Sequence, residues 1–201
     1  MNTVKIYLVR HGEILIDSEK RYIGQIDLPL NENGRKQAAR LRDQLSRVKL
    51  DRIICSDLAR AVTTASIIGE KQESQLEVKK ELREIDMGVW DGMTFASVRR
   101  SYPGEYEKRG SDLINYRPPG GESFAQCAAR VLPVIDDALQ VTAGKILIVG
   151  HAGVNRLIIC RALGLPMTGM FDIKQDYGCL NILQVAQGCW KVEVLNNQLY
   201  K

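Results

Sequence analysis

Three short apolar runs alternate along the chain with segments of helical periodicity, and this alternation is the strongest constraint on the fold. The runs are KIYLV at 5–9, RIIC at 52–55 and KILIVG at 145–150. Because they are short, continuous and rich in β-branched residues, they are typical of strands that are buried on both faces of a sheet. Such a sheet needs helices in two outer layers.

Amphipathic helical patterns follow the runs and supply those layers. Apolar side chains recur at helical spacing in four groups: Ala38, Leu41, Leu45 and Val48; Leu58, Ala61, Val62, Ala65 and Ile68; Phe124, Cys127, Ala128, Val131 and Ile135; Val154, Leu157, Ile158 and Ala162. Pro133 is expected to kink or restart the third helix. The segment NILQVAQGCWKVEVL at 181–195 predicts two strands around a turn at Gly188. We therefore expect an α/β fold, a three-layer sandwich with a mainly parallel sheet and helices on both faces, in a single domain over 1–201.

Composition and charge narrow the function without identifying it. The 201 residues carry a formal net charge of +4, with 28 basic and 24 acidic residues mixed along the chain and no dense basic tract, so no nucleic-acid partner is indicated. The five cysteines form no C-x-x-C pair, which favours reduced thiols over a disulfide framework or a metal site. No signal peptide or spanning segment is recognisable. We expect a cytoplasmic protein with no membrane partner.

Both histidines of the chain stand at the end of a predicted strand, with a glycine beside them. His11 follows Arg10, and His151 follows Gly150. In open α/β sheets, ligands bind beyond the carboxyl ends of the strands, where helix N-termini present free N–H groups. One such histidine would by default be a packed or surface residue, but two in the same setting indicate a site. Arg10 would oppose a metal ion and its planar guanidinium matches phosphate oxygens, so we expect a phosphate clamp beside a nucleophilic histidine, and no metal.

Beyond these residues, the sequence resembles the histidine phosphatase superfamily, whose members are also described as phosphoglycerate mutase-like. Six segments are similar to the family's blocks and lie in the family's order: LVRHGE at 8–13, RYIGQIDLPLNENGRKQA at 21–38, CSDLARAVTTA at 55–65, LREIDMGVWDG at 82–92, PPGGES at 118–123 and VGHAGVNR at 149–156. Together they extend over nearly the whole chain. The resemblance implies phosphoryl transfer that requires no metal or other cofactor.

Residue by residue, the resemblance implies five catalytic positions. His11 matches the nucleophile that becomes a phosphohistidine. Arg10, Arg60 and His151 match the groups that surround the phosphate. Glu84 matches the acid that protonates the leaving oxygen and then, as a carboxylate, activates water. Further contacts with the substrate are expected from residues that flank these positions, namely Asp17, Arg21, Ile23, Gly24, Gln25 and Ala152.

Position 17 departs from the family pattern, because Asp17 stands where a neutral asparagine is common. A carboxylate there would repel a phosphate dianion unless it were paired, with Arg10 or Arg21 as the candidate partners. Repulsion relieved by partial pairing is the favoured interpretation, so replacing Asp17 by asparagine is expected to raise kcat/KM a few-fold. If Asp17 instead orders an arginine, the same substitution should lower kcat/KM. Asp91, in a WDG motif where glutamate is more usual, is a milder change.

A cap over the site is expected at about 95–121. Its centre, SYPGEYEKRGSDLINYRPP at 101–119, is rich in tyrosine and basic residues, which could stack a ring or hold an extra anion, or could form a solvated flap. The segment is more compact than the corresponding insertion of the related mutases, and GQIDLPL is more similar to the phosphatase branch.

The resemblance therefore implies a phosphomonoester hydrolase that acts on a small molecule and is similar to alpha-ribazole phosphatases or broad-specificity phosphatases. Two alternatives stay open at this point: phosphoryl transfer of the phosphoglycerate mutase type, and a non-catalytic phosphate-binding module. The sequence also leaves the oligomeric state open, a homodimer included.

Overall fold

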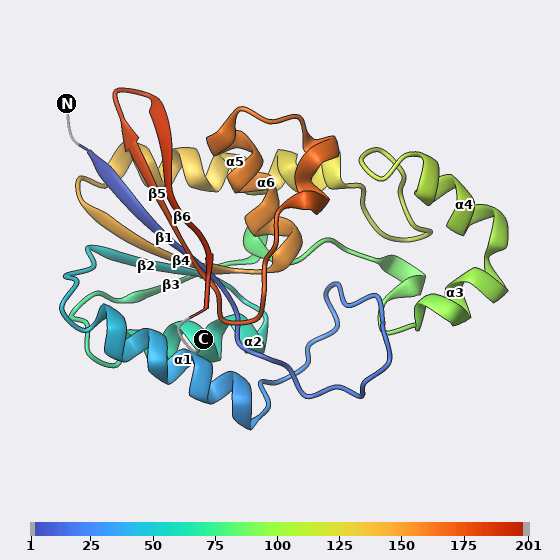
Figure 1. The fold of residues 1–201 in the computed structure, drawn as a ribbon, viewed down its shortest axis with the longest axis horizontal. Coiled ribbons are helices and arrows are strands. Elements are labelled where there is room, and N and C mark those ends of the chain that lie inside the picture. The colour runs from blue at the N-terminus through green and yellow to red at the C-terminus, as the bar shows by residue number, and fades with distance from the viewer. Residues whose placement is uncertain (1–2, 199–201) are drawn as a thin grey trace.

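A six-stranded sheet forms the middle layer of the structure, a computed structural model that describes residues 3–198 (Figure 1). Its strands are β1 (Val4–Arg10), β2 (Arg52–Ser56), β3 (Leu76–Lys79), β4 (Lys145–Gly150), β5 (Leu180–Ala186) and β6 (Cys189–Asn197), in the order β3-β2-β4-β1-β5-β6. The first four in this order run parallel, while β5 is antiparallel to both β1 and β6. The expected α/β class and mainly parallel sheet are confirmed.

Helices cover both faces of the sheet. The α-helices are α1 (Glu32–Leu45), α2 (Ala59–Gly69), α3 (Phe95–Ser101), α4 (Pro103–Ser111), α5 (Phe124–Val141) and α6 (Ala152–Leu163), with three 3-10 helices, η1 (Lys80–Leu82), η2 (Gly88–Trp90) and η3 (Met167–Asp172). Successive side chains of a strand point to opposite faces, so Leu8 joins the core beneath α5 and α6, whereas Val9 joins the core beneath α1 and α2. No helix in residues 3–198 is long and apolar enough to cross a membrane.

Two local features differ from the sequence expectations. The strand β3 was not expected, because its sequence LEVK lies at the sheet edge, is only partly buried and has no continuous apolar run. Of the two expectations for Pro133, the restart is wrong, since α5 continues through this residue, and the kink stays a prediction. Pro133 and Ala129, whose carbonyl loses its helical partner, are both exposed, so water can satisfy that carbonyl. The expected turn at Gly188 is confirmed: Gln187 and Gly188 both have positive φ, as a two-residue hairpin turn requires.

The helices α3 and α4 extend beyond the sheet on the side of the loop that joins β1 to α1 (Figure 1). An aromatic cluster connects them to that loop. The ring centroid of Tyr22, in the loop, lies 4.3 Å from that of Phe95 and 5.4 Å from that of Trp90. The guanidinium carbon of Arg109 lies 5.3 Å from the Tyr22 centroid. The segment expected to form a cap therefore packs against the loop that carries Ile23, Gly24 and Gln25.

Candidate active site

The register of the central strands brings the two histidines together. Arg10 of β1 and Gly150 of β4 are register partners, and each is followed directly by a histidine. The backbone N–H of His11 donates to the carbonyl of Gly150 at 3.0 Å, and the two imidazole ring centroids lie 5.1 Å apart. Both side chains are buried. The expected site at the carboxyl edge of the parallel strands therefore has a geometric basis in strand pairing.

The tautomer of His11 follows from its backbone neighbour. Its Nδ1 lies 2.7 Å from the carbonyl oxygen of Gly12, and because a carbonyl only accepts, Nδ1 carries the proton and Nε2 keeps its lone pair. Burial lowers the pKa of His11 well below its usual value of 6.5, and the neighbouring cations Arg10 and Arg60 lower it further. The ring is therefore neutral at physiological pH, as a nucleophile must be.

Arg60 projects from the first turn of α2 and is held by the loop after β1. Its two terminal nitrogens donate to the carbonyls of Gly24 at 2.6 Å and Ile26 at 2.8 Å. The same loop is fixed from the other side by Asp91, whose carboxylate accepts from the backbone N–H groups of Gly24, Gln25 and Ile26 at 2.7–2.8 Å. Gly24 and Ile26 thus connect Asp91 to Arg60, since each donates its N–H to Asp91 and accepts from Arg60 through its carbonyl. Gln25 donates to Asp91 only, and the predicted substrate contacts of Gly24 and Gln25 stay a prediction.

Arg10 is oriented by the segment before β5. Its Nη1 donates to the carbonyl of Gln175 at 2.6 Å, and its guanidinium carbon lies 3.7 Å above the ring of Tyr177. The Tyr177 ring is also 5.6 Å from the ring of His11. Cation and ring attract each other at this distance, so Tyr177 fixes the plane of the arginine next to the histidine.

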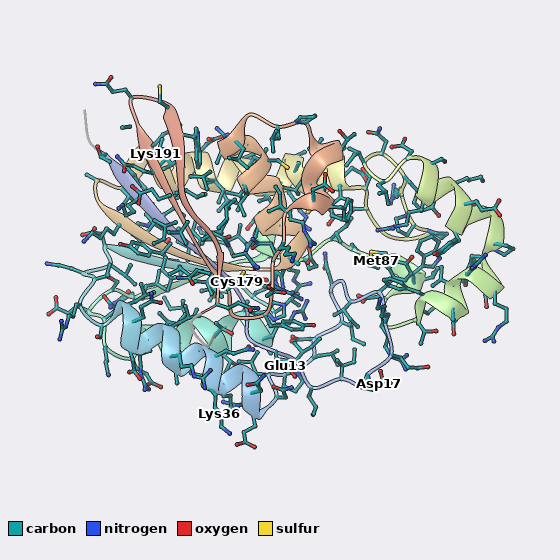
Figure 2. The ribbon with its side chains drawn as sticks, in the orientation of Figure 1. Glu13, Asp17, Lys36, Met87, Cys179 and Lys191 are labelled. Carbon is teal, nitrogen blue, oxygen red and sulfur yellow. The ribbon has the colours of Figure 1, made fainter. Side chains whose placement is uncertain are left out.

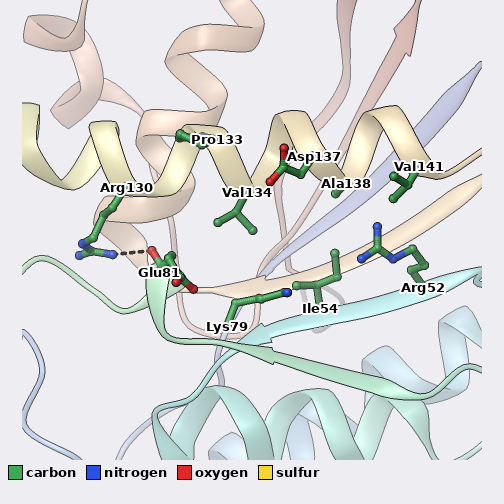
Figure 3. A pocket seen from close by; sticks show the side chains of 10 residues that line it. All are labelled: Arg52, Ile54, Lys79, Glu81, Arg130, Pro133, Val134, Asp137, Ala138 and Val141. Atoms are coloured by element: carbon green, nitrogen blue, oxygen red, sulfur yellow. Dashed lines mark hydrogen bonds between the residues drawn. The ribbon is translucent and has the colours of Figure 1, made fainter.

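Glu84 meets the site at the N-terminus of α6. Its Oε2 accepts from the backbone N–H of Gly153 at 3.0 Å, two residues after His151, and its side chain is buried. Ala152 is the first residue of this helix. Arg130 of α5 holds the segment that carries Glu84, donating to the carbonyls of residues 81, 83 and 84 and pairing with Glu122. Figure 3 shows the first of these bonds at the edge of a pocket of about 330 Å³ between α5 and the β2–β3 edge.

Four buried nitrogen atoms of the site lack a hydrogen-bond partner within residues 3–198. They are Nε of Arg10, Nε of Arg60 and both ring nitrogens of His151. A buried polar group without a partner costs about 1–3 kcal/mol, more for a charged group. Three of these nitrogens are donors, the two guanidinium Nε atoms and the one N–H of a neutral His151, so their position around His11 indicates a place built for an acceptor. Two guanidinium groups select a negatively charged acceptor, and their fork geometry suits a phosphate.

Comparison with known proteins identifies the family. Residues 6–198 match the model of the histidine phosphatase superfamily (branch 1). The chain belongs to this family. The adenosylcobalamin/alpha-ribazole phosphatase of Salmonella typhimurium is 30% identical over 97% of each chain, and phosphoserine phosphatase 1 of Hydrogenobacter thermophilus is 35% identical over 92% of this chain and 88% of the relative. The crystal structure of the alpha-ribazole phosphatase from Shigella flexneri matches with a TM-score of 0.90 at 29% identity, covering 96% of each chain.

The protein is thus a phosphatase of the histidine phosphatase superfamily, and the resemblance inferred from its six sequence segments is confirmed. Its substrates are small-molecule phosphates, as in the family. The structure brings the five expected catalytic residues of this phosphatase to one edge of the sheet. Within residues 3–198, no group of three or more histidine, cysteine, aspartate or glutamate side chains is arranged to hold a metal ion.

Asp17 and Arg21 form an ion pair at the rim of the phosphatase site. The carboxylate accepts from Nε of Arg21 at 3.0 Å and from Nη2 at 2.6 Å, and Arg21 holds the pKa of Asp17 below its usual value. Of the two expected partners, Arg21 is therefore the one that the structure selects. The Asp17 side chain is 52% exposed, on the part of the loop that lies away from the sheet (Figure 2).

Two residues of the site were missed by the sequence reasoning. Tyr177 has no motif around it, because its place at the site depends on β5 being antiparallel to β1, which puts the beginning of β5 at the carboxyl edge of the parallel strands. Asp91 was noted only as a departure from the usual glutamate. Its task could not be seen because it binds backbone amides, which have no signature in the sequence.

Proposed function

We propose that this phosphatase hydrolyses phosphomonoesters through a phosphohistidine formed at Nε2 of His11. The observation that carries the proposal is the state of this ring: its Nδ1 proton is committed to the Gly12 carbonyl, and burial with two nearby cations keeps the ring neutral. A neutral imidazole with a free lone pair, next to unpartnered guanidinium nitrogens, is arranged to attack a bound phosphate.

In the first half-reaction, Nε2 of His11 forms a bond to phosphorus and the bond from phosphorus to the alcohol oxygen breaks. Protonated Glu84 donates its proton to the leaving oxygen, because an alkoxide is a poor leaving group. In the second, the Glu84 carboxylate takes a proton from water, whose oxygen attacks phosphorus as the P–N bond breaks. Inorganic phosphate and the neutral His11 result. Arg10 and Arg60 stabilise the negative charge of both transition states, and His151 donates from one ring nitrogen.

Two features support a substrate of the kind that alpha-ribazole phosphatases or broad-specificity phosphatases hydrolyse. The relatives of that name match over nearly the full length of both chains. The α3–α4 segment packs against the loop beside the site and would act as the cap that selects the alcohol. A panel of phosphomonoesters that includes alpha-ribazole phosphate, assayed by release of inorganic phosphate, tests this assignment. Appearance of an isomeric phosphate ester in place of inorganic phosphate would indicate a mutase.

The mechanism is tested by trapping the intermediate. The reaction of the protein with a phosphomonoester is quenched in alkali, because phosphohistidine is hydrolysed in acid. Mass spectrometry of the peptides should then place one phosphate on His11. Turnover should survive EDTA and be abolished in His11→Ala, whereas Lys191→Ala on the exposed strand β6 should keep full activity. Absolute dependence on a metal ion, or full activity of His11→Ala, would contradict the mechanism. Binding of vanadate without turnover of any ester in the panel would favour the non-catalytic alternative.

A further inference from the structure

A groove of about 560 Å³ lies next to the catalytic residues, inside the loop that joins β1 to α1. Tyr177 lines it, and the Tyr177 ring lies 3.7 Å from the guanidinium carbon of Arg10 and 5.6 Å, centroid to centroid, from the ring of His11. Phe95, the first residue of α3, also lines the groove. A substrate whose phosphate lies between Arg10 and His11 therefore has this groove open to its alcohol part.

The apolar side chains that line the groove and are partly exposed, which form its apolar wall, are Ile16, Ile23, Phe95 and Tyr177. Ile14, which also lines it, is buried. Ile16 is 37% exposed and Phe95 is 40% exposed. Exposed apolar side chains that gather along one groove, with polar groups at its rim, are typical of a binding site for an apolar ligand. The alcohol part of the substrate is the occupant that this wall fits, because Tyr177 both lines the groove and packs beside the ring of His11.

The rim of the groove carries more negative than positive charge. Its three carboxylates are Glu13, Asp17 and Glu19, and its two cations are Lys20 and Arg21. Arg21 is already neutralised, since it pairs with both Asp17 and Glu19. Glu13 is bound by the side-chain amides of Asn31 and Asn33, which are neutral and leave its charge in place. An alcohol that carries a carboxylate or a second phosphate would meet net repulsion here, moderated by solvent screening because the rim is exposed.

We propose that this groove is the alcohol subsite and that it selects phosphomonoesters of extended, ring-bearing apolar alcohols without a second anionic group. The inference rests on the proposed function, hydrolysis at His11. It also separates the relatives: the small, carboxylate-bearing alcohol of phosphoserine would leave the apolar wall uncovered and place its charge near the acidic rim.

Three esters with similar leaving groups test the subsite: ethyl phosphate, phenethyl phosphate and the para-carboxylate derivative of phenethyl phosphate. The added ring is remote from the reacting oxygen, so differences in kcat/KM report contacts of the alcohol. We expect kcat/KM for phenethyl phosphate to exceed that for ethyl phosphate by about tenfold, which corresponds to about 1.4 kcal/mol. The kcat/KM of the carboxylate derivative should be about threefold lower than that of phenethyl phosphate, a size typical of screened surface charges. Glu19→Gln, which leaves the bond between Asp17 and Arg21 in place, should recover most of that loss.

A matched pair of variants locates the effect. Ile16→Ser changes the groove wall, whereas Leu15→Ser changes the neighbouring residue, which is 64% exposed and does not line the groove. Ile16→Ser should reduce the preference for phenethyl over ethyl phosphate at least threefold, and Leu15→Ser should leave it unchanged. Equal kcat/KM for the two esters in the wild type, or an equal loss for both in Ile16→Ser, would overturn the subsite.

Failure of the proposed function gives a different result. In that case none of the three esters is hydrolysed, and calorimetric Kd values on the His11→Ala protein still compare phenethyl with ethyl phosphate. Tighter binding of the phenethyl ester there, reduced by Ile16→Ser, supports the groove as a binding site for apolar esters. Equal Kd values refute it.

Discussion

The carboxylate of Glu84 lies against the first turn of α6, where its Oε2 accepts a hydrogen bond from the backbone N–H of Gly153 at 3.0 Å. The approach is this close because residue 153 has no side chain: a Cβ atom there would lie 2.5 Å from Oε1 of Glu84 and 3.1 Å from the ring of Phe124. The glycine therefore sets the position of the proposed acid, two residues after His151.

Gly153→Ala should consequently displace Glu84 and slow both half-reactions. A displacement on the order of 1 Å of a catalytic group can cost roughly a hundredfold in rate, so we expect kcat to fall by about that factor, with little change in the affinity for inorganic phosphate, which Arg10 and Arg60 bind. Gly169→Ala is the matched control, because a Cβ at residue 169 meets nothing within 4 Å. Unchanged kcat in Gly153→Ala would show that Glu84 is not the acid or tolerates displacement.

Asp91→Asn should lower activity indirectly, by loosening the loop that holds Arg60. An amide oxygen replaces a carboxylate that accepts three backbone N–H bonds from the loop whose carbonyls hold Arg60, and charge-assisted bonds are about twice as strong as neutral ones. We expect kcat/KM to fall roughly tenfold. In an Arg60→Ala background the same change should have almost no further effect. Fully additive losses in this double-mutant cycle would mean that Asp91 acts independently of Arg60.

Asp17→Asn should have a smaller effect than the few-fold gain expected from the sequence. The carboxylate is already paired with Arg21 through two bonds and its side chain is half exposed, so a phosphate would experience little of its charge. Steady-state kinetics should show kcat/KM for ethyl phosphate within about twofold of the wild type. A loss of tenfold would make Asp17 a working part of the site, and a large gain would restore the repulsion hypothesis.

Stability should decrease as the pH falls below 6.5. Burial lowers the pKa of both His11 and His151 well below this value in the native protein, whereas in the unfolded chain both rings titrate near it. The unfolded state therefore binds more protons in acid, so the stabilisation is fully present above 6.5 and is lost as the pH falls toward the native pKa values. Two protons give a slope of at most about 2.7 kcal/mol per pH unit.

Urea unfolding at a series of pH values, in buffers without phosphate or sulfate, measures this slope. His11→Gln removes one of the two titrating rings and should reduce the slope by about half, which separates the histidines from carboxylates that titrate lower. A free energy of unfolding that stays constant from about pH 7 to about pH 5.5 would show that the buried rings accept protons in the native state.

The sequence by itself determined the strands that form the centre of the sheet and the positions of the two histidines. β1, β2 and β4 are continuous apolar runs, so their local sequence pattern predicts that they are buried on both faces. Because parallel strands end at the same edge of a sheet, the residues that follow β1 and β4 were expected at that edge, whereas the pairing of β1 with β4, which brings them together, is a property of the fold. His11, His151 and the arginine of β1 could therefore be placed before the structure was considered.

The tertiary structure alone decided how these groups are held. Tyr177 reaches Arg10 because β5 runs antiparallel to β1, and nothing in the 180–186 segment states its direction. Asp91 and Arg130 act on backbone groups of distant segments, and every residue has such groups, so no pattern reveals which ones they bind. Asp17 had two candidate partners, and only the course of the loop selected Arg21. Local sequence determines which side chains are buried and where strands end, whereas pairings across the chain depend on strand direction and loop path, which form only as the whole chain packs.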